Sequence, residues 1–377
     1  MIGKLDLITL QQIWWILCSV VGSLFLFLNF VQGGQTLLWQ VAKNDREKAL
    51  VINSLGRKWE LTFTTLVLFG GALFAAYPKF YATSFGGAYW VWMLILFTFI
   101  LQAVSYEYRK KPDNLLGAKT YELFLFINGS VGILLIGAAV GTFFTGSNFI
   151  LNDYNQVRWT SGLRGVEAAF SLFNLSLGLF LVCNARVLGA MYLINNIDFK
   201  GVYEMEARIR KSCLTSFLLA LPFLVYVVAA LLLMDGFGVD ENGTVTMVAN
   251  KYLHNLLAMP VVLGMLLAGL FLVILGVTRT GLGTATNGIW FGGLGTVLVG
   301  LAVFFTAGFN NTPFYPSKVD LQSSLTIYNA SSSHYTLTAM SYVALFIPAV
   351  LAYIAYVWWS MNARKIGSED ISDSKAY

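Results

Sequence analysis

Side chains that could bind a haem iron or a metal ion are few in this sequence. There are two histidines, His254 and His334, and three cysteines, Cys18, Cys183 and Cys213. A membrane-bound haem needs axial ligands inside the bilayer, and zinc needs closely spaced cysteines or histidines. Both histidines stand at the ends of apolar segments, where an interfacial role is more typical than ligation. We therefore expect this chain to bind neither a metal nor a haem through its own side chains.

Carboxylates beside apolar segments are the next candidates for chemistry. Glu60 follows Trp59 at the start of such a segment, with the hydroxyl of Thr62 close behind it. Two interpretations stay open for Glu60. It could cap a helix N-terminus, where the helix dipole favours negative charge, or it could take up protons at the rim of a membrane. Glu122 and Glu167 also open apolar segments, and capping is the more typical role for both.

Two glutamines interrupt the first apolar segment. Gln32 and Gln35 flank a pair of glycines in an otherwise hydrophobic run. Small residues allow helices in a membrane to pack closely, and the amides could then bond across helices. Alternatively, the two amides could give a polar lining to a cavity. The sequence leaves both interpretations open.

The composition places these residues in a membrane protein. Of the 377 residues, 57% are hydrophobic and 11% are charged, and the mean hydropathy is +0.68. An ordinary soluble domain is about 25% charged. The composition therefore excludes a soluble enzyme, a disordered chain and a nucleic-acid-binding module. The apolar runs are also too long and continuous for the strands of a membrane barrel.

Nine apolar segments are long enough to cross a bilayer as helices, which takes about 20 residues. Their expected cores are residues 12–31, 61–81, 88–106, 121–144, 165–185, 214–234, 256–276, 285–307 and 339–361. A helix satisfies all of its backbone hydrogen bonds within itself, as the bilayer requires. We expect an all-α, polytopic bundle of nine transmembrane helices that forms a single integral membrane domain over residues 1–377.

The basic residues predict how this bundle is oriented. With nine spans, the connections on one side and the C-terminal tail, including Lys375, hold 18 of the 24 lysine and arginine residues. Cytoplasmic loops carry the excess of positive charge in membrane proteins. We therefore expect the N-terminus outside and the C-terminus in the cytoplasm. The net charge of +5 reflects this topology and does not indicate a nucleic-acid partner.

Three regions together resemble subunit II of the cytochrome bd quinol oxidases. The first contains Ile52-Asn-Ser-Leu, Trp59-Glu60 and Gly70-Gly-Ala-Leu-Phe-Ala-Ala-Tyr-Pro78. The second is Tyr106-Glu107-Tyr108-Arg109. The third contains Tyr315-Pro316-Ser317, Ser324-Leu325-Thr326, Ala330-Ser331-Ser332 and Thr336-Leu337. The resemblance covers nearly the whole chain and is weakest between residues 145 and 305.

The resemblance implies a haem-free accessory subunit that pairs with cytochrome bd subunit I. This family reduces dioxygen to water with electrons from a membrane quinol, takes the protons from the cytoplasm and builds a proton-motive force. Haem b and haem d are expected in the partner subunit, and some members hold a structural quinone. A small single-span subunit is a further candidate partner, beside membrane lipid and quinol. The implied location is the bacterial cytoplasmic (inner) membrane.

The same resemblance implies roles for individual residues. Glu60 aligns with an acid attributed to proton uptake, and Glu107 belongs to the second matching motif, so both are expected on a proton pathway. Gln32 and Gln35 stand where the family often carries Asp-Gly-Phe-Asp, and Gln102 stands where it often carries an arginine. These three amides are expected to line a cavity. Amides do not ionise at neutral pH, so these departures indicate a divergent branch.

A secondary transporter or permease is the alternative function. Such a protein needs a polar binding site near the midplane of the membrane, often between broken helices. The apolar segments of this chain carry almost no charge at mid-span, and no internal repeat is evident. These observations favour the oxidase subunit over the transporter.

Overall fold

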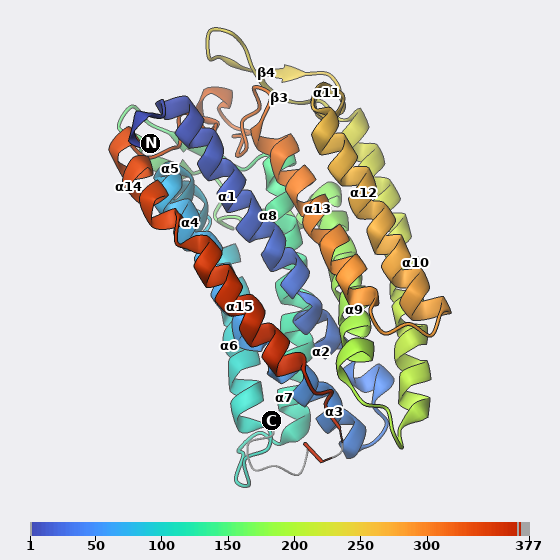
Figure 1. The fold of residues 1–377 in the computed structure, drawn as a ribbon. Coiled ribbons are helices and arrows are strands. Elements are labelled where there is room, and N and C mark those ends of the chain that lie inside the picture. The colour runs from blue at the N-terminus through green and yellow to red at the C-terminus, as the bar shows by residue number, and fades with distance from the viewer. Residues whose placement is uncertain (1, 368, 371–377) are drawn as a thin grey trace.

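Long helices that run between two polar ends make up most of the molecule (Figure 1). The computed structural model describes residues 2–367 and 369–370. The N-terminus and the last described residues lie at opposite ends of the bundle (Figure 1), as an odd number of spans requires. The expected all-α class is confirmed. Lys375, which belongs to the predicted basic side, lies outside the described residues.

The elements follow one another in this order. The α-helices are α1 (Leu7–Leu28), α2 (Phe30–Val41), α3 (Asp45–Gly56), α4 (Trp59–Ala76), α5 (Pro78–Tyr81), α6 (Tyr89–Tyr108), α7 (Ala118–Ile127), α8 (Ile133–Thr145), α9 (Leu172–Asn196), α10 (Tyr203–Leu233), α11 (Lys251–Ala258), α12 (Pro260–Val277), α13 (Gly288–Gly308), α14 (His334–Ala344) and α15 (Ile347–Asn362). Short 3₁₀ segments are η1 (Ile2–Lys4), η4 (Val166–Phe170) and η6 (Leu321–Ser323), and π-helical segments are η2 (Ala82–Gly86), η3 (Asn128–Gly132) and η5 (Thr278–Leu282). The strands are β1 (Phe149–Leu151), β2 (Val157–Trp159), β3 (Gly236–Val239) and β4 (Val245–Val248).

The predicted number of spans is confirmed with one qualification. Among the described residues, eight helical stretches are long and apolar enough to cross a membrane. The ninth span consists of α14 and α15, which meet at an angle of 41°. Pro348 lies in the first turn of α15, where its missing N–H group costs no helix hydrogen bond.

Helix breaks divide the first two spans in a way that hydropathy does not reveal. The first span runs from Leu7 to Val41 and changes from α1 to α2 at Asn29. The second joins α3 to α4 and ends at Ala76. The predicted end at residue 81 was too late, because Pro78 begins the separate short helix α5. Proline has no N–H group to continue a preceding helix.

The fifth predicted span, residues 165–185, needs correction at both ends. Residues Val166–Phe170 form the 3₁₀ segment η4, and α9 starts only at Leu172. Helix α9 then continues to Asn196, so Arg186 lies inside the helix and not in a loop. Its guanidinium donates to the Thr36 carbonyl oxygen and hydroxyl, and to the side chain of Gln40. These bonds offset the cost of the charge at this depth.

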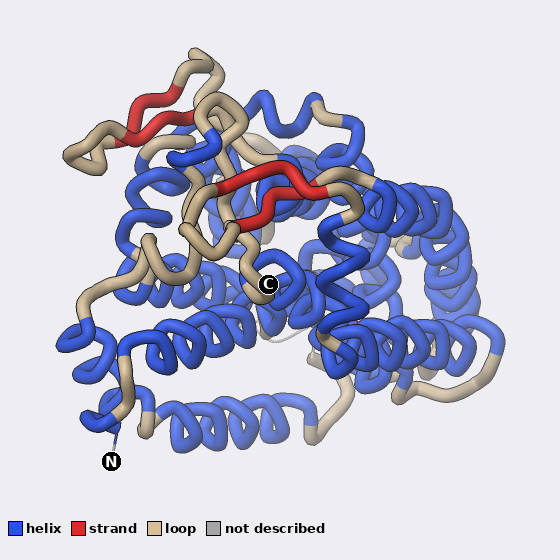
Figure 2. The backbone as a smooth tube through the Cα atoms, turned by 90° about the horizontal axis from the view of Figure 1, so that it is seen from above, coloured by secondary structure: helices blue, strands red, loops and turns tan. Residues whose placement is uncertain are grey.

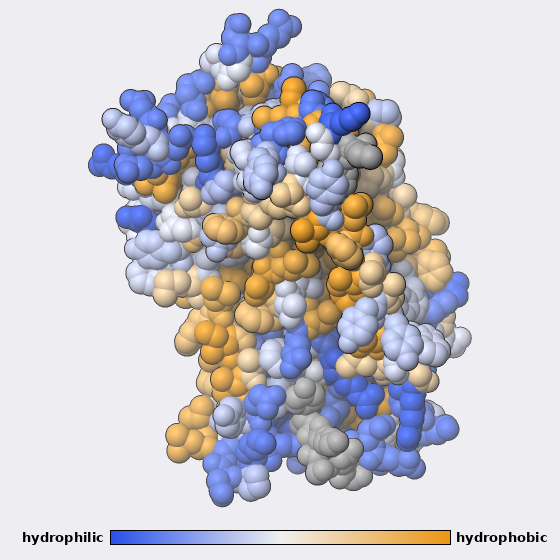
Figure 3. Space-filling view, turned by 60° about the vertical axis from the view of Figure 1, so that its left-hand side comes forward, coloured by the Kyte–Doolittle hydropathy of each residue, from blue (hydrophilic) through white to orange (hydrophobic). Residues whose placement is uncertain are grey.

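Polar connections gather at the end that carries the N-terminus. Both antiparallel hairpins, β1–β2 and β3–β4, lie there (Figure 2). The connection after α13 is tied to them by a bridge between Ser147 and Ser317. Seen from the side, a hydrophobic band separates this polar end from the other (Figure 3). The band is what a bilayer would cover.

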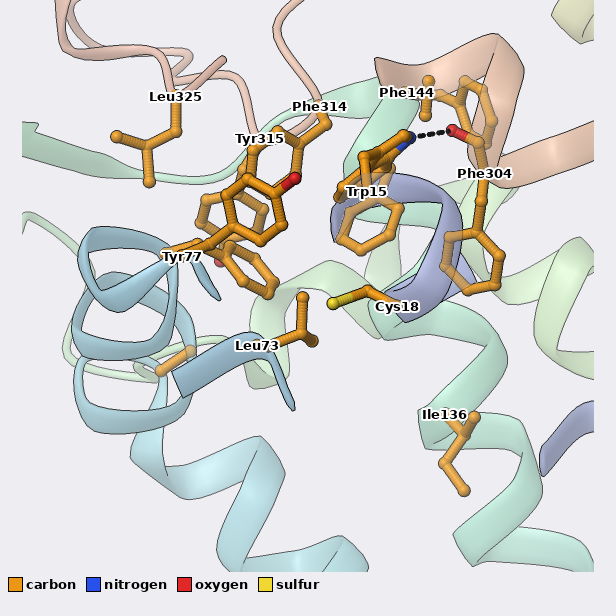
Figure 4. Packing of buried hydrophobic residues seen from close by; sticks show 14 of the residues in the cluster. Trp15, Cys18, Leu73, Tyr77, Ile136, Phe144, Phe304, Phe314, Tyr315 and Leu325 are labelled. Carbon is orange, nitrogen blue, oxygen red and sulfur yellow. Dashed lines mark hydrogen bonds between the residues drawn. The ribbon is translucent and has the colours of Figure 1, made fainter. Parts of the chain in front are cut away.

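An aromatic core fills the half of the bundle next to the hairpins. Trp15 packs against Tyr77, Phe304 and Phe314, with ring centroids 4.6–6.5 Å apart (Figure 4). Its indole N–H donates to the Phe304 carbonyl oxygen at 3.1 Å. This core brings α1, α4, α13 and the connection after α13 together.

Candidate functional site

The two predicted proton-pathway acids lie at the rim of the bundle, at the end opposite the N-terminus. Glu60 is in the first turn of α4 and Glu107 is in the last turn of α6, and both side chains are exposed on this chain. Their chain neighbours Trp59 and Tyr106 stack, with centroids 5.8 Å apart and planes at 11°. The stacked rings lie between the two exposed acids at the rim and the buried residues inside the bundle.

The predicted amides lie directly inside this rim. Gln35 donates to the Tyr106 hydroxyl at 3.1 Å, and Gln32 donates to the Gln102 side-chain oxygen at 3.4 Å. All three glutamines are buried, with at most 2% of their surface exposed. The structure therefore brings Gln32 of α2 and Gln102 of α6 together as one pair of amides. Gln35 bonds Tyr106 instead, and Tyr106 links it to the stacked rings at the rim.

A third pair continues the series and was missed by the sequence reasoning. The Asn128 amide of η3 donates to the Thr98 hydroxyl at 3.4 Å, and both residues are buried. Thr98, Gln102 and Tyr106 follow at four-residue intervals, which places them on one face of α6. That spacing was the available signal. We call the three pairs Gln35–Tyr106, Gln32–Gln102 and Asn128–Thr98 the polar ladder.

The two glycines between Gln32 and Gln35 determine how closely α2 approaches α9. A side chain at Gly33 would collide with the backbone of Ala185, and a side chain at Gly189 of α9 would collide with the backbone of Gly34. The packing interpretation therefore holds for the glycines. The amides beside them point to α6 instead, so close packing and a polar lining coexist in the same helix.

A buried ion cluster lies one helical turn beyond the ladder, towards the rim. Glu122 is 2% exposed and accepts from Arg109, Lys48 and the Trp39 indole at 2.9, 2.9 and 3.0 Å. The expectation that Glu122 caps a helix was wrong, because α7 begins at Ala118 and its first turn holds no acid. Glu167 does lie in the first turn of its segment, and its carboxylate accepts from the Gly165 N–H.

Potential metal ligands lie apart from one another. His254 is exposed on α11, and the exposed His334 ring bonds the Leu5 carbonyl oxygen at 2.8 Å. Cys18 and Cys213 are buried in different helices. Within residues 2–367 and 369–370, no group of three or more His, Cys, Asp or Glu side chains could hold a metal ion.

An apolar cavity of about 180 Å³ lies elsewhere in the bundle. It is enclosed mainly by α8, α9, α10, α12 and α13. Its walls are hydrophobic apart from Asn184 and Thr296, and the Asn184 amide donates to the Thr296 hydroxyl at 3.4 Å. Such a cavity could hold a hydrocarbon chain, and hydropathy alone gave no sign of it.

The fold and the site together define a polytopic helical membrane protein with buried polar pairs between its helices. Residues 10–361 match the family described as cytochrome bd terminal oxidase subunit II. The chain belongs to this family, and the resemblance noted from the sequence motifs is confirmed. It is thus a subunit of a terminal oxidase complex and a multi-pass protein of the inner membrane.

Individual relatives agree with this assignment. The chain is 28% identical to the cytochrome bd-I ubiquinol oxidase subunit 2 of Escherichia coli K12, over 97% of this chain and 98% of the relative. It is 27% identical to a probable cytochrome oxidase subunit 2 of Haemophilus influenzae, over 94% and 95% of the two chains. A chain of the bd oxidase from Geobacillus thermodenitrificans has a similar fold, with a TM-score of 0.66, 16% identity and coverage of 94% and 98%.

Proposed function

We propose that this chain is the haem-free accessory subunit of a quinol oxidase that reduces dioxygen to water and builds a proton-motive force. Its partner is cytochrome bd subunit I, and its roles are to support assembly and to give cytoplasmic protons access to the partner's haems. The single observation that supports proton access best is the continuous contact from the rim to the interior. Trp59 stacks on Tyr106, and Tyr106 bonds Gln35.

Within this proposal, Glu60 and Glu107 collect protons at the cytoplasmic rim. Both carboxylates are exposed on this chain and lie beside the stacked pair. Gln32, Gln35 and Gln102 line the polar path that leads inward. The amides bind and orient hydrogen-bonding partners, while the rim carboxylates are acid–base groups that can accept a proton and pass it on.

The orientation and the single-domain organisation belong to the same proposal. The N-terminus lies outside, the last helix ends in the cytoplasm, and residues 1–377 form one membrane domain. The exposed residues Lys110 and Lys111 follow α6 at the rim end, in agreement with the excess of positive charge expected in cytoplasmic loops.

The histidines of this chain do not fit a haem site. Histidine is a common axial ligand of haem iron, and both histidines lie exposed at one end of the bundle. We therefore place haem b and haem d in subunit I. A structural quinone fits better, because the apolar cavity could hold its isoprenoid chain and Asn184 and Thr296 offer polar contacts to a headgroup. A small single-span subunit would complete the complex.

Purification of the affinity-tagged chain from its native membrane tests this proposal. We expect a second, larger membrane subunit to co-purify with a reduced-minus-oxidised haem spectrum, and the complex to consume oxygen when quinol is added. A colourless chain that purifies alone and moves a solute into proteoliposomes would contradict the proposal and would support a transporter.

A further inference from the structure

Arg186 is the one charged residue of α9, and the rest of the described chain does not neutralise it. The side chain is half-buried and donates to the Ser216 hydroxyl at 3.3 Å, to the Thr36 carbonyl oxygen and hydroxyl at 3.2 and 2.9 Å, and to the Gln40 side chain at 2.6 Å. All of these acceptors are neutral. Within the described residues, no carboxylate lies within ion-pair distance of Arg186.

One N–H group of this guanidinium also lacks an acceptor among the described residues. An arginine side chain carries five N–H groups, whereas the chain offers it four acceptor atoms. The remaining N–H belongs to Nη2, the nitrogen that bonds Gln40, and Gln40 is exposed. An unpaired charge is costly at membrane depth. The charge and the spare donor therefore indicate an anionic group that approaches Arg186 from the surface of the bundle.

The guanidinium lies close to the rim of the bundle. Gln40 is in the last turn of α2, and the carbonyl oxygen of Val41, where α2 ends, accepts from Arg208 of α10 at 2.8 Å. This junction lies at the end of the bundle away from the N-terminus (Figure 1). The guanidinium is thus within one helical turn, about 5 Å, of the end of α2. Phospholipid headgroups of the adjoining leaflet lie near this depth.

An apolar strip leads from Arg186 towards the middle of the membrane. Leu175, Leu179 and Cys183 are half-buried and precede Arg186 at intervals of three or four residues, so the four side chains share one face of α9. From Leu175 to Arg186 the strip is about 16 Å long. Half of the hydrocarbon core of a bilayer is about 15 Å thick. The strip, which we call the Arg186 strip, therefore matches the length of one acyl chain in one leaflet.

Neighbouring helices flank the Arg186 strip on both sides. On one side α8 packs closely against α9, because a side chain at Gly178 would collide with the Leu134 carbonyl oxygen. On the other side the bond from Arg186 to Ser216 holds α10 in place. Leu219, less than one turn further along α10, is 60% exposed. The flanking surface next to the strip is therefore apolar as well.

Further positive charge lies at the ends of the helices that hold Arg186. Lys43 lies just beyond α2 and Lys211 lies on α10, and both are exposed. Glu47 and Glu204 both pair with Arg208, at 2.6 and 3.6 Å. Lysines and arginines near a membrane surface attract anionic lipids, and basic sites between helices bind their headgroups.

An anionic phospholipid fits these features better than other occupants. A quinone headgroup is uncharged and would leave the charge of Arg186 uncompensated. A helix of another subunit would cover the apolar strip, but it would neutralise Arg186 only with a carboxylate at this depth. A phosphate diester brings the negative charge, can accept more than one guanidinium N–H, and carries the acyl chains that the strip requires.

We infer that the Arg186 strip binds one anionic phospholipid from the leaflet at the rim end of the bundle. Its phosphate lies on the Arg186 guanidinium, and one acyl chain lies along Leu175, Leu179 and Cys183. Gln40 and Ser216 are positioning residues, because they hold the guanidinium towards the surface. The inference concerns a lipid site and does not depend on the proposed function.

Native mass spectrometry of the intact, delipidated complex tests the headgroup. We expect the wild type to bind one dioleoyl phosphatidylglycerol tightly, and Arg186→Gln to bind it about tenfold more weakly. Arg279→Gln is the matched control. Arg279 is exposed on η5, outside the strip, and it also bonds a neutral acceptor, Asn287, at 3.2 Å. Equal affinity of the wild type and Arg186→Gln would overturn the inference.

Two further probes test which part of the lipid is recognised. Dioleoyl phosphatidylcholine and inorganic phosphate should each bind to the wild type at least about tenfold more weakly than dioleoyl phosphatidylglycerol. Equal binding of phosphatidylcholine would contradict selection of an anionic headgroup. Equal binding of inorganic phosphate would show that the acyl strip plays no part, and this result would overturn a lipid site.

A cryo-EM map of the wild-type complex in phosphatidylglycerol nanodiscs needs no variant and tests the position of the lipid. We expect a headgroup within hydrogen-bond distance of Arg186 and chain density along Leu179 and Cys183. A bare strip, or a protein helix that covers it, would overturn the inference even if Arg186→Gln failed to assemble. A complex without haem or oxidase activity would contradict the proposed function, while the map and the lipid counts would still decide on the lipid site.

Discussion

At the scale of single residues, Glu60 carries the most specific expectation. Its carboxylate is exposed at the rim, next to Trp59, which stacks on Tyr106. The first turn of α4 also suits a capping role. The two roles differ in consequence, because a cap contributes to stability and a proton acceptor contributes to turnover.

Replacement of Glu60 distinguishes the two roles. Glu60→Gln keeps the size of the side chain and removes the ionisable group, so we expect roughly tenfold or greater loss of quinol oxidase turnover with normal assembly and haem content. The rate of oxygen consumption by the purified complex measures this turnover. Glu241→Gln, at an exposed site in the hairpin at the opposite end, is the control. Unchanged turnover in Glu60→Gln would contradict proton uptake by Glu60 and would indicate that this residue caps α4.

The sequence predicted individual residues of the site with mixed success. Gln32, Gln35 and Gln102 were identified by their type and by the family resemblance, and the structure pairs two of them directly. Asn128 and Thr98 were missed because a lone Asn or Thr in an apolar run is common and reveals its partner only in three dimensions. Whether any of these residues handles protons stays a prediction.

At the scale of elements, helix ends and interruptions determine where the polar groups meet. The α1–α2 junction and the π-helical turn η3 place side chains of separate spans in contact. Hydropathy averages over a window of about 19 residues, so it finds a span but not a break inside it. The nine segments were therefore predictable, whereas the breaks and the true limits of α9 were not.

The ion cluster beyond the ladder is the element-scale feature with the clearest energetic consequence. Glu122 pairs with both Arg109 and Lys48, which are 8% and 19% exposed, and joins α2, α3, α6 and α7. Since removal of one partner leaves buried charges unpaired, Glu122→Gln should destabilise the protein by roughly 3–5 kcal/mol. Thermal or chemical unfolding of the purified complex measures this loss.

An exposed ion pair provides the control for that measurement. The Glu204 side chain is 95% exposed, and its carboxylate oxygen lies 3.6 Å from a guanidinium nitrogen of Arg208 on the same helix. An exposed pair of this kind contributes at most about 0.5 kcal/mol, so Glu204→Gln should unfold almost as the wild type does. Equal stability of the two variants would contradict the structural role of the Glu122 cluster.

At the scale of the whole molecule, the bundle has two chemically distinct ends. One holds the N-terminus and both hairpins, and the other holds the acids of the rim, the ion cluster and the inward ladder (Figure 1). Charge counting predicted which end faces the cytoplasm. The N-terminus and the last described residues lie at opposite ends, as an odd number of spans requires, and which end faces the cytoplasm stays a prediction.

Cysteine labelling in intact cells checks the orientation. In a background without the three native cysteines, Asn242→Cys in the hairpin connection should react with a membrane-impermeant thiol reagent added outside. Lys111→Cys, at an exposed site after α6, should react only after the cells are opened. The reverse pattern would place the rim acids outside the cell and would contradict proton access from the cytoplasm.

The most direct test of the account is a stopped-flow measurement of proton uptake. The fully reduced complex is mixed with oxygen in the presence of a pH-sensitive dye, and haem oxidation is followed at the same time. We predict that the wild type and Glu241→Gln take up protons together with haem oxidation, and that Glu60→Gln and Gln102→Met take them up at least about tenfold more slowly with an unchanged haem spectrum. Equal rates of proton uptake in all four proteins would contradict the claim that this subunit supplies the protons.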